Sequence, residues 1–281
     1  MDIHSKRGIF TCANDNFVES LKGFLISAQK FNPDLPICVI PFDNNHEKIE
    51  RLCKEFKVHF WDQHVDFFDH IGAKIFGNRN HRPNAKKKNY FRKLASFLGP
   101  FEQFIFLDVS IRILSDITKV FSIYEHSEYD ILFYSRSLPF RNFHNDALIE
   151  VLEVLNSDIR RGFAAGCFVS RAGVVKRSDL ETISNPSEKL VPLLGGAPEQ
   201  SFLNYFCGVT ATKCERIIHF DKSFPMSLTP DLIEKRDEGE FYRKFGKVDA
   251  GKKLYFALVR ERDTPEGHKD YWLIEEFKNA Q

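Results

Sequence analysis

Three polar residues at the end of one apolar segment have types and spacing that could carry chemistry. The apolar run 103–107 leads into Asp108, and Ser110 and Arg112 follow at alternate positions. Because alternate strand residues share a face, we expect Asp108, Ser110 and Arg112 to point into one crevice. A carboxylate, a hydroxyl and a guanidinium group there could bind a metal-bridged diphosphate. The simpler alternative is that Asp108 begins a turn.

A second chemical feature is a basic stretch between residues 79 and 93. It contains seven basic residues and no acid, with Tyr90 and Phe91 beside them: Arg79, Arg82, Lys86, Lys87, Lys88, Arg92 and Lys93. It could be a flap that binds phosphate, a contact for an anionic acceptor or nucleic acid, or a solvated loop. The formal net charge of +1 argues against attraction of nucleic acid over the whole surface, so nucleic acid is not an expected partner.

Common nucleotide-binding motifs are missing or incomplete. The fingerprint G-x-G-x-x-G does not follow the first apolar segment, where Thr11-Cys12-Ala13-Asn14-Asp15 stands instead. The segment 246–253 resembles a phosphate loop, but Lys253 occupies the position that requires Ser or Thr. A nicotinamide or flavin enzyme and a phosphate-loop enzyme are therefore disfavoured.

The elements that must position these residues alternate between strand and helix. Apolar runs predict strands at 8–13, 36–41, 58–61 and 103–108, and helical periodicity predicts helices at 17–28, 45–56 and 90–98. This order favours a parallel sheet with helices on its faces, whose ligands gather at the carboxyl ends of the strands. The second half predicts strands at 129–134 and 162–170 and helices at 146–155, 172–183 and 198–206.

Length and composition predict one large domain in a reducing compartment. We expect residues 1–225 to form the main domain and residues 226–281, which are rich in charge and glycine, to pack on it as an extension. No run approaches the roughly 18 apolar residues of a membrane span. The six cysteines include no C-x-x-C pair, so we predict a cytoplasmic protein without a membrane span.

Five short segments occur in an order that resembles a known family. They are Thr11-x-x-Asn14-Asp15, Lys93-Leu94, Phe104–Asp108, Gly162–Gly166 and Glu199-Gln200-x-x-Leu203-Asn204. Over residues 8–210 this order resembles the glycogenin and galactosyltransferase-like family of retaining glycosyltransferases. The resemblance implies the GT-A fold, an α/β fold with a mostly parallel central sheet and helices on both faces. It also implies transfer of a sugar from a nucleotide-diphosphate sugar, with a uridine diphosphate sugar expected, to an unidentified acceptor with retention.

The resemblance also implies the residues of the site. The residues that it implies in nucleotide and donor binding are Thr11, Asn14, Asp15, Lys93 and Asp108, and the strand alternation described above adds Ser110 and Arg112 to them. The residues implied at the donor sugar and the reaction centre, and hence in catalysis, are Lys93, Glu199 and Gln200.

Three positions depart from the family pattern. Ser110 replaces the second acid, Ala164 replaces an asparagine, and Glu199 replaces an aspartate. The resemblance implies Asp108 as a ligand of Mn²⁺ or Mg²⁺, but a neutral serine hydroxyl is a weaker ligand than a carboxylate. We therefore expect weak or absent dependence on a divalent cation. The departures leave open an inactive relative that binds a nucleotide, a sugar or a protein partner.

Overall fold

A seven-stranded sheet forms the centre of the protein. The computed structural model describes residues 6–76, 85–134, 164–184, 198–221, 226–227, 233–235, 241–243 and 256–258. The strand order is β3-β2-β1-β4-β7-β6-β8. In chain order these strands are β1 (Arg7–Ala13), β2 (Ile37–Pro41), β3 (His59–Phe60), β4 (Gln103–Leu107), β6 (Ile131–Phe133), β7 (Cys167–Arg171) and β8 (Cys214–Arg216). Only β7 runs against its neighbours β4 and β6, so the prediction of a mostly parallel sheet is confirmed.

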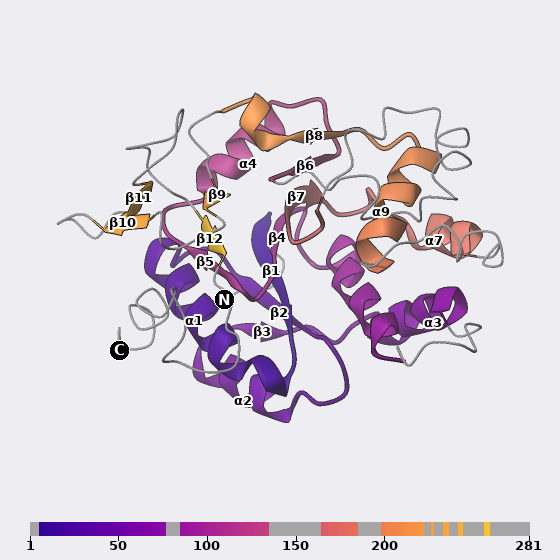
Figure 1. Cartoon of the computed structure of the whole chain (residues 1–281), viewed down its shortest axis with the longest axis horizontal. Coiled ribbons are helices and arrows are strands. Elements are labelled where there is room, and N and C mark those ends of the chain that lie inside the picture. Colours follow the sequence, from indigo (N-terminus) through magenta and orange to yellow (C-terminus); the bar gives the residue numbers. More distant parts are fainter. Residues whose placement is uncertain are drawn as a thin grey trace.

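Helices cover both faces of this sheet (Figure 1). One face packs against α1 (Val18–Phe31), α2 (Glu47–Glu55) and α4 (Thr118–Glu125) through one apolar core. The other face packs against α3 (Val65–Phe76), the helical segment η2 (Ala85–Leu98), α7 (Arg177–Ser184) and α9 (Pro198–Val209) through a second core. The expected arrangement of helices on both faces is confirmed.

Phenylalanines of the second core hold η2 in place. The Phe97 ring stacks on Phe168 of β7 with centroids 5.5 Å apart, and Phe168 stacks in turn on Phe106 of β4 at 5.4 Å. Phe91 lies 5.3 Å from Phe202 of α9. Because such rings are rigid and large, these contacts fix the position of η2 between the sheet and α9.

The carboxyl ends of β1 and β4 lie side by side. The two strands are parallel, and Phe10 pairs with Phe106 in their register. After Leu107 the chain turns, because the amide of Ile111 donates a hydrogen bond of 2.9 Å to the carbonyl of Asp108. The chain then enters β5 (Ile111–Ile113), which belongs to another sheet. The expected alternation from Asp108 through Arg112 is therefore wrong, since a turn interrupts it.

The remaining described elements are short. The segment 226–281 contributes β9 (Met226–Ser227) and β12 (Phe256–Leu258), and β12 pairs with β5. The other short elements are η1 (Asp15–Phe17), η6 (Ile217–His219), β10 (Ile233–Lys235) and β11 (Phe241–Arg243). The division of the chain at residue 225 remains a prediction.

Several boundaries differ from the sequence-based expectations. Helix α3 was not predicted, although Phe68, Ile71 and Ile75 supply an apolar face with helical spacing. The strand expected at 162–170 begins at Cys167, and the helix expected at 172–183 begins at Arg177. The helix expected at 146–155 lies outside the described residues.

Candidate active site

Three charged side chains from three elements meet beside the carboxyl ends of β1 and β4. The Nζ atom of Lys93, on η2, lies 3.2 Å from Oδ1 of Asp108, which directly follows β4. The same nitrogen lies 3.2 Å from Oε1 of Glu199, in the first turn of α9. We call these three residues the Lys93 cluster. The structure thus brings together three residues that the sequence had placed in the site.

Lys93 is a buried and permanent positive charge. Its residue is 7% exposed, and Nζ lies 5.3 Å from the centroid of the Phe106 ring. Burial by itself would lower the pKa of Lys93, but the carboxylates of Asp108 and Glu199 more than compensate and raise this pKa above its ordinary value. The ammonium group therefore stays protonated across the physiological range.

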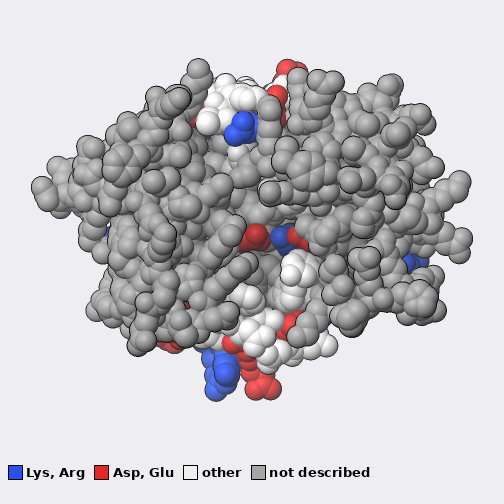
Figure 2. Space-filling view, in the orientation of Figure 1, with Lys and Arg blue, Asp and Glu red and all other residues white. Residues whose placement is uncertain are grey.

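The two acids of the cluster differ in their access to solvent. The side chain of Asp108 is 42% exposed, whereas Glu199 is buried. Within the described part of the chain, the Glu199 Oε2 atom is buried and has no hydrogen-bond partner. A buried acceptor without a hydrogen bond is energetically costly. A ligand hydroxyl that donated a hydrogen bond to Oε2 would remove this cost and so favour binding. Figure 2 shows acidic and basic side chains together near the centre of one face of the molecule.

Gly166 allows the close approach of Asp108 to the neighbouring loop. The Asp108 amide donates a 2.8 Å hydrogen bond to the Gly166 carbonyl. A Cβ atom at position 166 would lie 2.6 Å from Oδ2 of Asp108, which is closer than non-bonded atoms approach. Glycine at this position therefore leaves room for the carboxylate of Asp108 where it faces Lys93.

Gln200 fixes the same loop from α9. Its side-chain oxygen Oε1 accepts a 3.1 Å hydrogen bond from the amide of Ala165. Its carbonyl accepts a 2.8 Å bond from Nδ2 of Asn204. Gln200 thus connects α9 to residues 164–166 next to the Lys93 cluster.

The residues expected at the nucleotide occupy different environments. Asn14 is buried, and its amide nitrogen donates a 2.8 Å bond to Asp43. Asp15 accepts bonds of 2.9 and 3.1 Å from the amides of Lys48 and Ile49, so it caps the first turn of α2. These contacts shape the loops after β1 and β2.

Thr11 does not reach the crevice. Its residue is 0% exposed, because it shares a strand face with Ile9 and Ala13, which pack under α1. Cys12 instead faces the cluster, where Lys93 and Asp108 both influence its pKa. No role was expected for Cys12 from the sequence, and strand alternation at this edge of the sheet is the signal that could have identified it.

Arg112 also lies away from the crevice. It is 1% exposed, and its guanidinium donates a 3.1 Å bond to the carbonyl of Val109. A Cβ atom at Gly23 of α1 would lie 2.8 Å from its Nε, so the guanidinium fills the space beneath that helix. Ser110 is half-buried on the turn. The expectation that Arg112 faces the site together with Asp108 is therefore wrong, because the turn redirects its side chain into the interior.

The basic stretch does not form one solvated loop. Residues 85–93 belong to η2, and Arg92 and Lys93 are both buried. Arg92 forms a bidentate salt bridge with Asp69 of α3, with hydrogen bonds of 2.7 and 2.6 Å. It also donates a 2.7 Å hydrogen bond to Asn44. Residues 77–84 lie outside the described part, and so do the side chains of Lys86, Lys87 and Lys88.

The donor set around Asp108 does not fit a divalent cation. Mn²⁺ and Mg²⁺ require several oxygen ligands, most often with more than one carboxylate. The described residues hold no group of three or more His, Cys, Asp and Glu that could bind a metal ion. Asp108 already faces the Lys93 ammonium, and Ser110 adds only a hydroxyl. A cation at Asp108 would meet the positive charge of Lys93.

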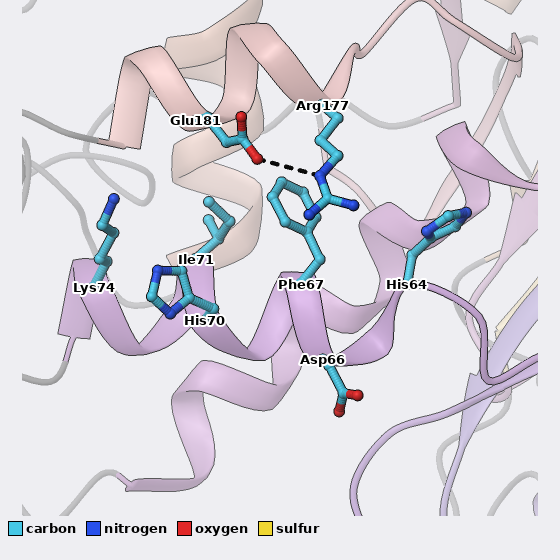
Figure 3. A pocket seen from close by; sticks show the side chains of 8 residues that line it. All are labelled: His64, Asp66, Phe67, His70, Ile71, Lys74, Arg177 and Glu181. Atoms are coloured by element: carbon cyan, nitrogen blue, oxygen red, sulfur yellow. Dashed lines mark hydrogen bonds and ion pairs between the residues drawn. The ribbon is translucent and has the colours of Figure 1, made fainter.

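A separate cavity of about 700 Å³ lies between α3 and α7 (Figure 3). Among its lining side chains, Arg177 lies 4.3 Å from the centroid of the Phe67 ring and 3.2 Å from Glu181. Figure 3 shows Asp66 pointing away from these groups. No residue of the Lys93 cluster lines this cavity.

The fold and the family match identify a GT-A-like glycosyltransferase. The chain belongs to the family described as "Mannosyltransferase putative", whose model matches residues 6–167. This membership confirms the glycosyltransferase prediction. No curated protein matches the chain. No helix in the described ranges is long and apolar enough to cross a membrane.

Solved structures of glycosyltransferases are similar in fold. The bifunctional glycosyltransferase WbbM has a TM-score of 0.60 at 14% identity, with 99% of this chain and 50% of WbbM covered. The galactosyltransferase LgtC, solved with donor and acceptor sugar analogues, has a TM-score of 0.55 at 13% identity, with coverage of 96% and 94%. Mouse xyloside xylosyltransferase 1 has a TM-score of 0.55 at 12% identity, with coverage of 89% and 97%. The chain thus spans half the length of WbbM and nearly all of LgtC.

Proposed function

We propose that the protein transfers a hexose from a nucleotide-diphosphate sugar to an acceptor hydroxyl at the Lys93 cluster. The observation that carries this proposal is the buried ammonium between two acids at the carboxyl edge of the sheet. When the bond between the sugar and the diphosphate breaks, negative charge develops on the leaving phosphate oxygen. A fixed positive charge at that point stabilises the transition state more than the ground state.

Each residue of the cluster has a proposed role. Lys93 faces the diphosphate, and Oε2 of Glu199, which has no hydrogen-bond partner in the part of the chain that the structure describes, accepts a hydrogen bond from a hydroxyl of the donor sugar. Gln200, which is oriented by Ala165, lies at the reaction centre. Asp108 orients Lys93 and contacts the ribose, and Asn14 and Asp15 shape the nucleotide loop.

The identities of donor and acceptor are proposed more coarsely. The family description favours mannose as the sugar, and the motif resemblance favours a uridine nucleotide and retention of configuration. The acceptor receives the sugar on a hydroxyl group. The six cysteines are free thiols, which supports a reducing compartment such as the cytoplasm.

Calorimetry with a panel of donors tests this function. The panel contains the uridine diphosphate and guanosine diphosphate derivatives of mannose, glucose and galactose. We expect one of these nucleotide sugars to bind the wild-type protein and to be hydrolysed slowly. Lys93→Met should reduce turnover about 100-fold or more, since removal of one preorganised charge-stabilising donor has effects of this size. Lys54→Met removes an exposed lysine that pairs with Glu50 on the surface, and it should change neither donor binding nor turnover.

The outcomes separate enzyme from binding protein. If a nucleotide sugar binds but is neither hydrolysed nor used to glycosylate any of a range of sugar acceptors, the protein is an inactive relative that only binds its ligand. Absence of binding by every donor would contradict the proposed function. NMR of the transferred sugar's anomeric centre tests retention.

A further inference from the structure

The Lys93 cluster has the geometry of a cation site that an ammonium group already fills. The Asp108 Oδ1 and Glu199 Oε1 atoms both lie 3.2 Å from Lys93 Nζ, so two carboxylates from different elements converge on one point. A divalent metal ion would require such converging oxygens. In this chain the point of convergence is occupied by a side chain.

The ammonium group is held in that place. Lys93 is buried, its stem passes near the Phe106 ring, and neighbouring aromatic residues fix η2 against the sheet. Moving Lys93 aside would leave Glu199 buried without its counter-ion, which is strongly unfavourable. At the point where the two carboxylates converge, a metal ion could therefore enter only against the charge of Lys93 and at the cost of this pairing.

We infer that Lys93 replaces the divalent cation, and that sugar transfer at this site needs no added metal. This inference rests on the proposed function. In the step, the bond between the anomeric carbon and the phosphate oxygen breaks, and its electron pair remains on that oxygen beside Lys93. The acceptor oxygen bonds to the anomeric carbon, and its proton passes to the departing diphosphate.

The first test measures binding of Mn²⁺ alone to the whole chain. Calorimetry and electron paramagnetic resonance should detect no tight Mn²⁺ site in wild type. Lys93→Ala removes the ammonium and frees both carboxylates, so it should gain a Mn²⁺ site. Lys93→Ala combined with Asp108→Asn should lose that site again, and Lys54→Ala should behave as wild type. Tight Mn²⁺ binding at Asp108 in wild type would overturn the inference.

The second test measures donor turnover with and without metal. With the donor that binds wild type, hydrolysis should be equal in excess chelator and in excess Mn²⁺ or Mg²⁺. A loss of about tenfold or more in chelator, which is about 1.4 kcal/mol in the barrier, would overturn the inference and leave the proposed function intact. If no donor binds or reacts under either condition, both the inference and the proposed function fail. This test uses wild type alone, so it stands even if Lys93→Ala does not fold.

Discussion

Arg92 and Lys93 are neighbours in sequence, and both are buried cations, yet they occupy clusters of different kinds. Arg92 makes short bonds of 2.6 to 2.7 Å with Asp69 and Asn44, and a further bond of 3.3 Å with the carbonyl of Pro41. Lys93 makes two longer contacts of 3.2 Å, one with a half-exposed acid and one with an acid that has one oxygen without a hydrogen-bond partner among the described residues. The Arg92 cluster therefore has the features of a structural network, and the Lys93 cluster has those of a site prepared for a ligand.

The largest expected effect concerns stability at the Arg92 cluster. Arg92→Met should lower the free energy of unfolding by about 3–5 kcal/mol, because it leaves Asp69 and the Pro41 carbonyl without their partner. Lys93→Met should also be costly, because Glu199 loses its counter-ion, but the loss should be smaller, since Lys93 makes two contacts of 3.2 Å, one of them to the half-exposed Asp108, where Arg92 makes four hydrogen bonds. Chemical denaturation followed by circular dichroism measures both. Equal losses in the two variants would contradict the distinction between the clusters.

The second prediction perturbs the geometry of the Lys93 cluster without removing a charge. Gly166→Ala would place a methyl group against the Asp108 carboxylate, so the carboxylate must move and Lys93 must follow. Donor turnover should fall about 100-fold, as expected for a displacement of about 1 Å at a reacting centre.

Gly173→Ala is the matched control for this substitution. Gly173 has a φ of +79° and open space around its Cα. Alanine there should lower stability by about 1–2 kcal/mol through backbone strain and leave turnover unchanged. If both variants lost turnover to the same degree, the effect at Gly166 would be one of general stability.

Much of the scaffold could be predicted from the sequence because its signals are local. Buried apolar runs such as Ile37–Pro41 and the helical spacing of residues 17–28 specify their own structures. The position of Asp108 at the carboxyl edge of the sheet followed from the end of an apolar strand, whereas Lys93 and Glu199 were assigned to the same site by the resemblance of the motif order to a known family.

The directions of individual side chains could not be predicted, because tertiary contacts decide them. Arg112 points inward because a hydrogen-bonded turn ends β4, and nothing in the strand pattern marks that turn except Asp108 itself. Thr11 points away from the site and Cys12 points toward it, because the face of β1 toward the site depends on which helices cover it. Arg92 and Lys93 are adjacent in the sequence, and the elements that carry their acidic partners separate them: Asp69 lies on the unpredicted α3, and Asp108 follows β4.

The smallest expected effect uses Cys12 as a reporter between the two clusters. Burial raises the pKa of the Cys12 thiol to about 12, and nearby Lys93 partly opposes this rise. Because the thiolate is the nucleophile, labelling by iodoacetamide should be slow and should rise about tenfold per pH unit between roughly pH 7 and 9. Mass spectrometry of the labelled peptide measures this rate.

A nucleotide diphosphate bound beside Lys93 should slow the labelling of Cys12 by covering it. Cys214, on the edge strand β8, is half-buried like Cys12 and lies at the far side of the sheet from β1, so its labelling should not change. Binding stabilises the whole fold by mass action, which would protect both thiols alike if labelling required unfolding. Protection of Cys12 alone would therefore place the ligand at the Lys93 cluster, whereas equal protection of both thiols would contradict that placement.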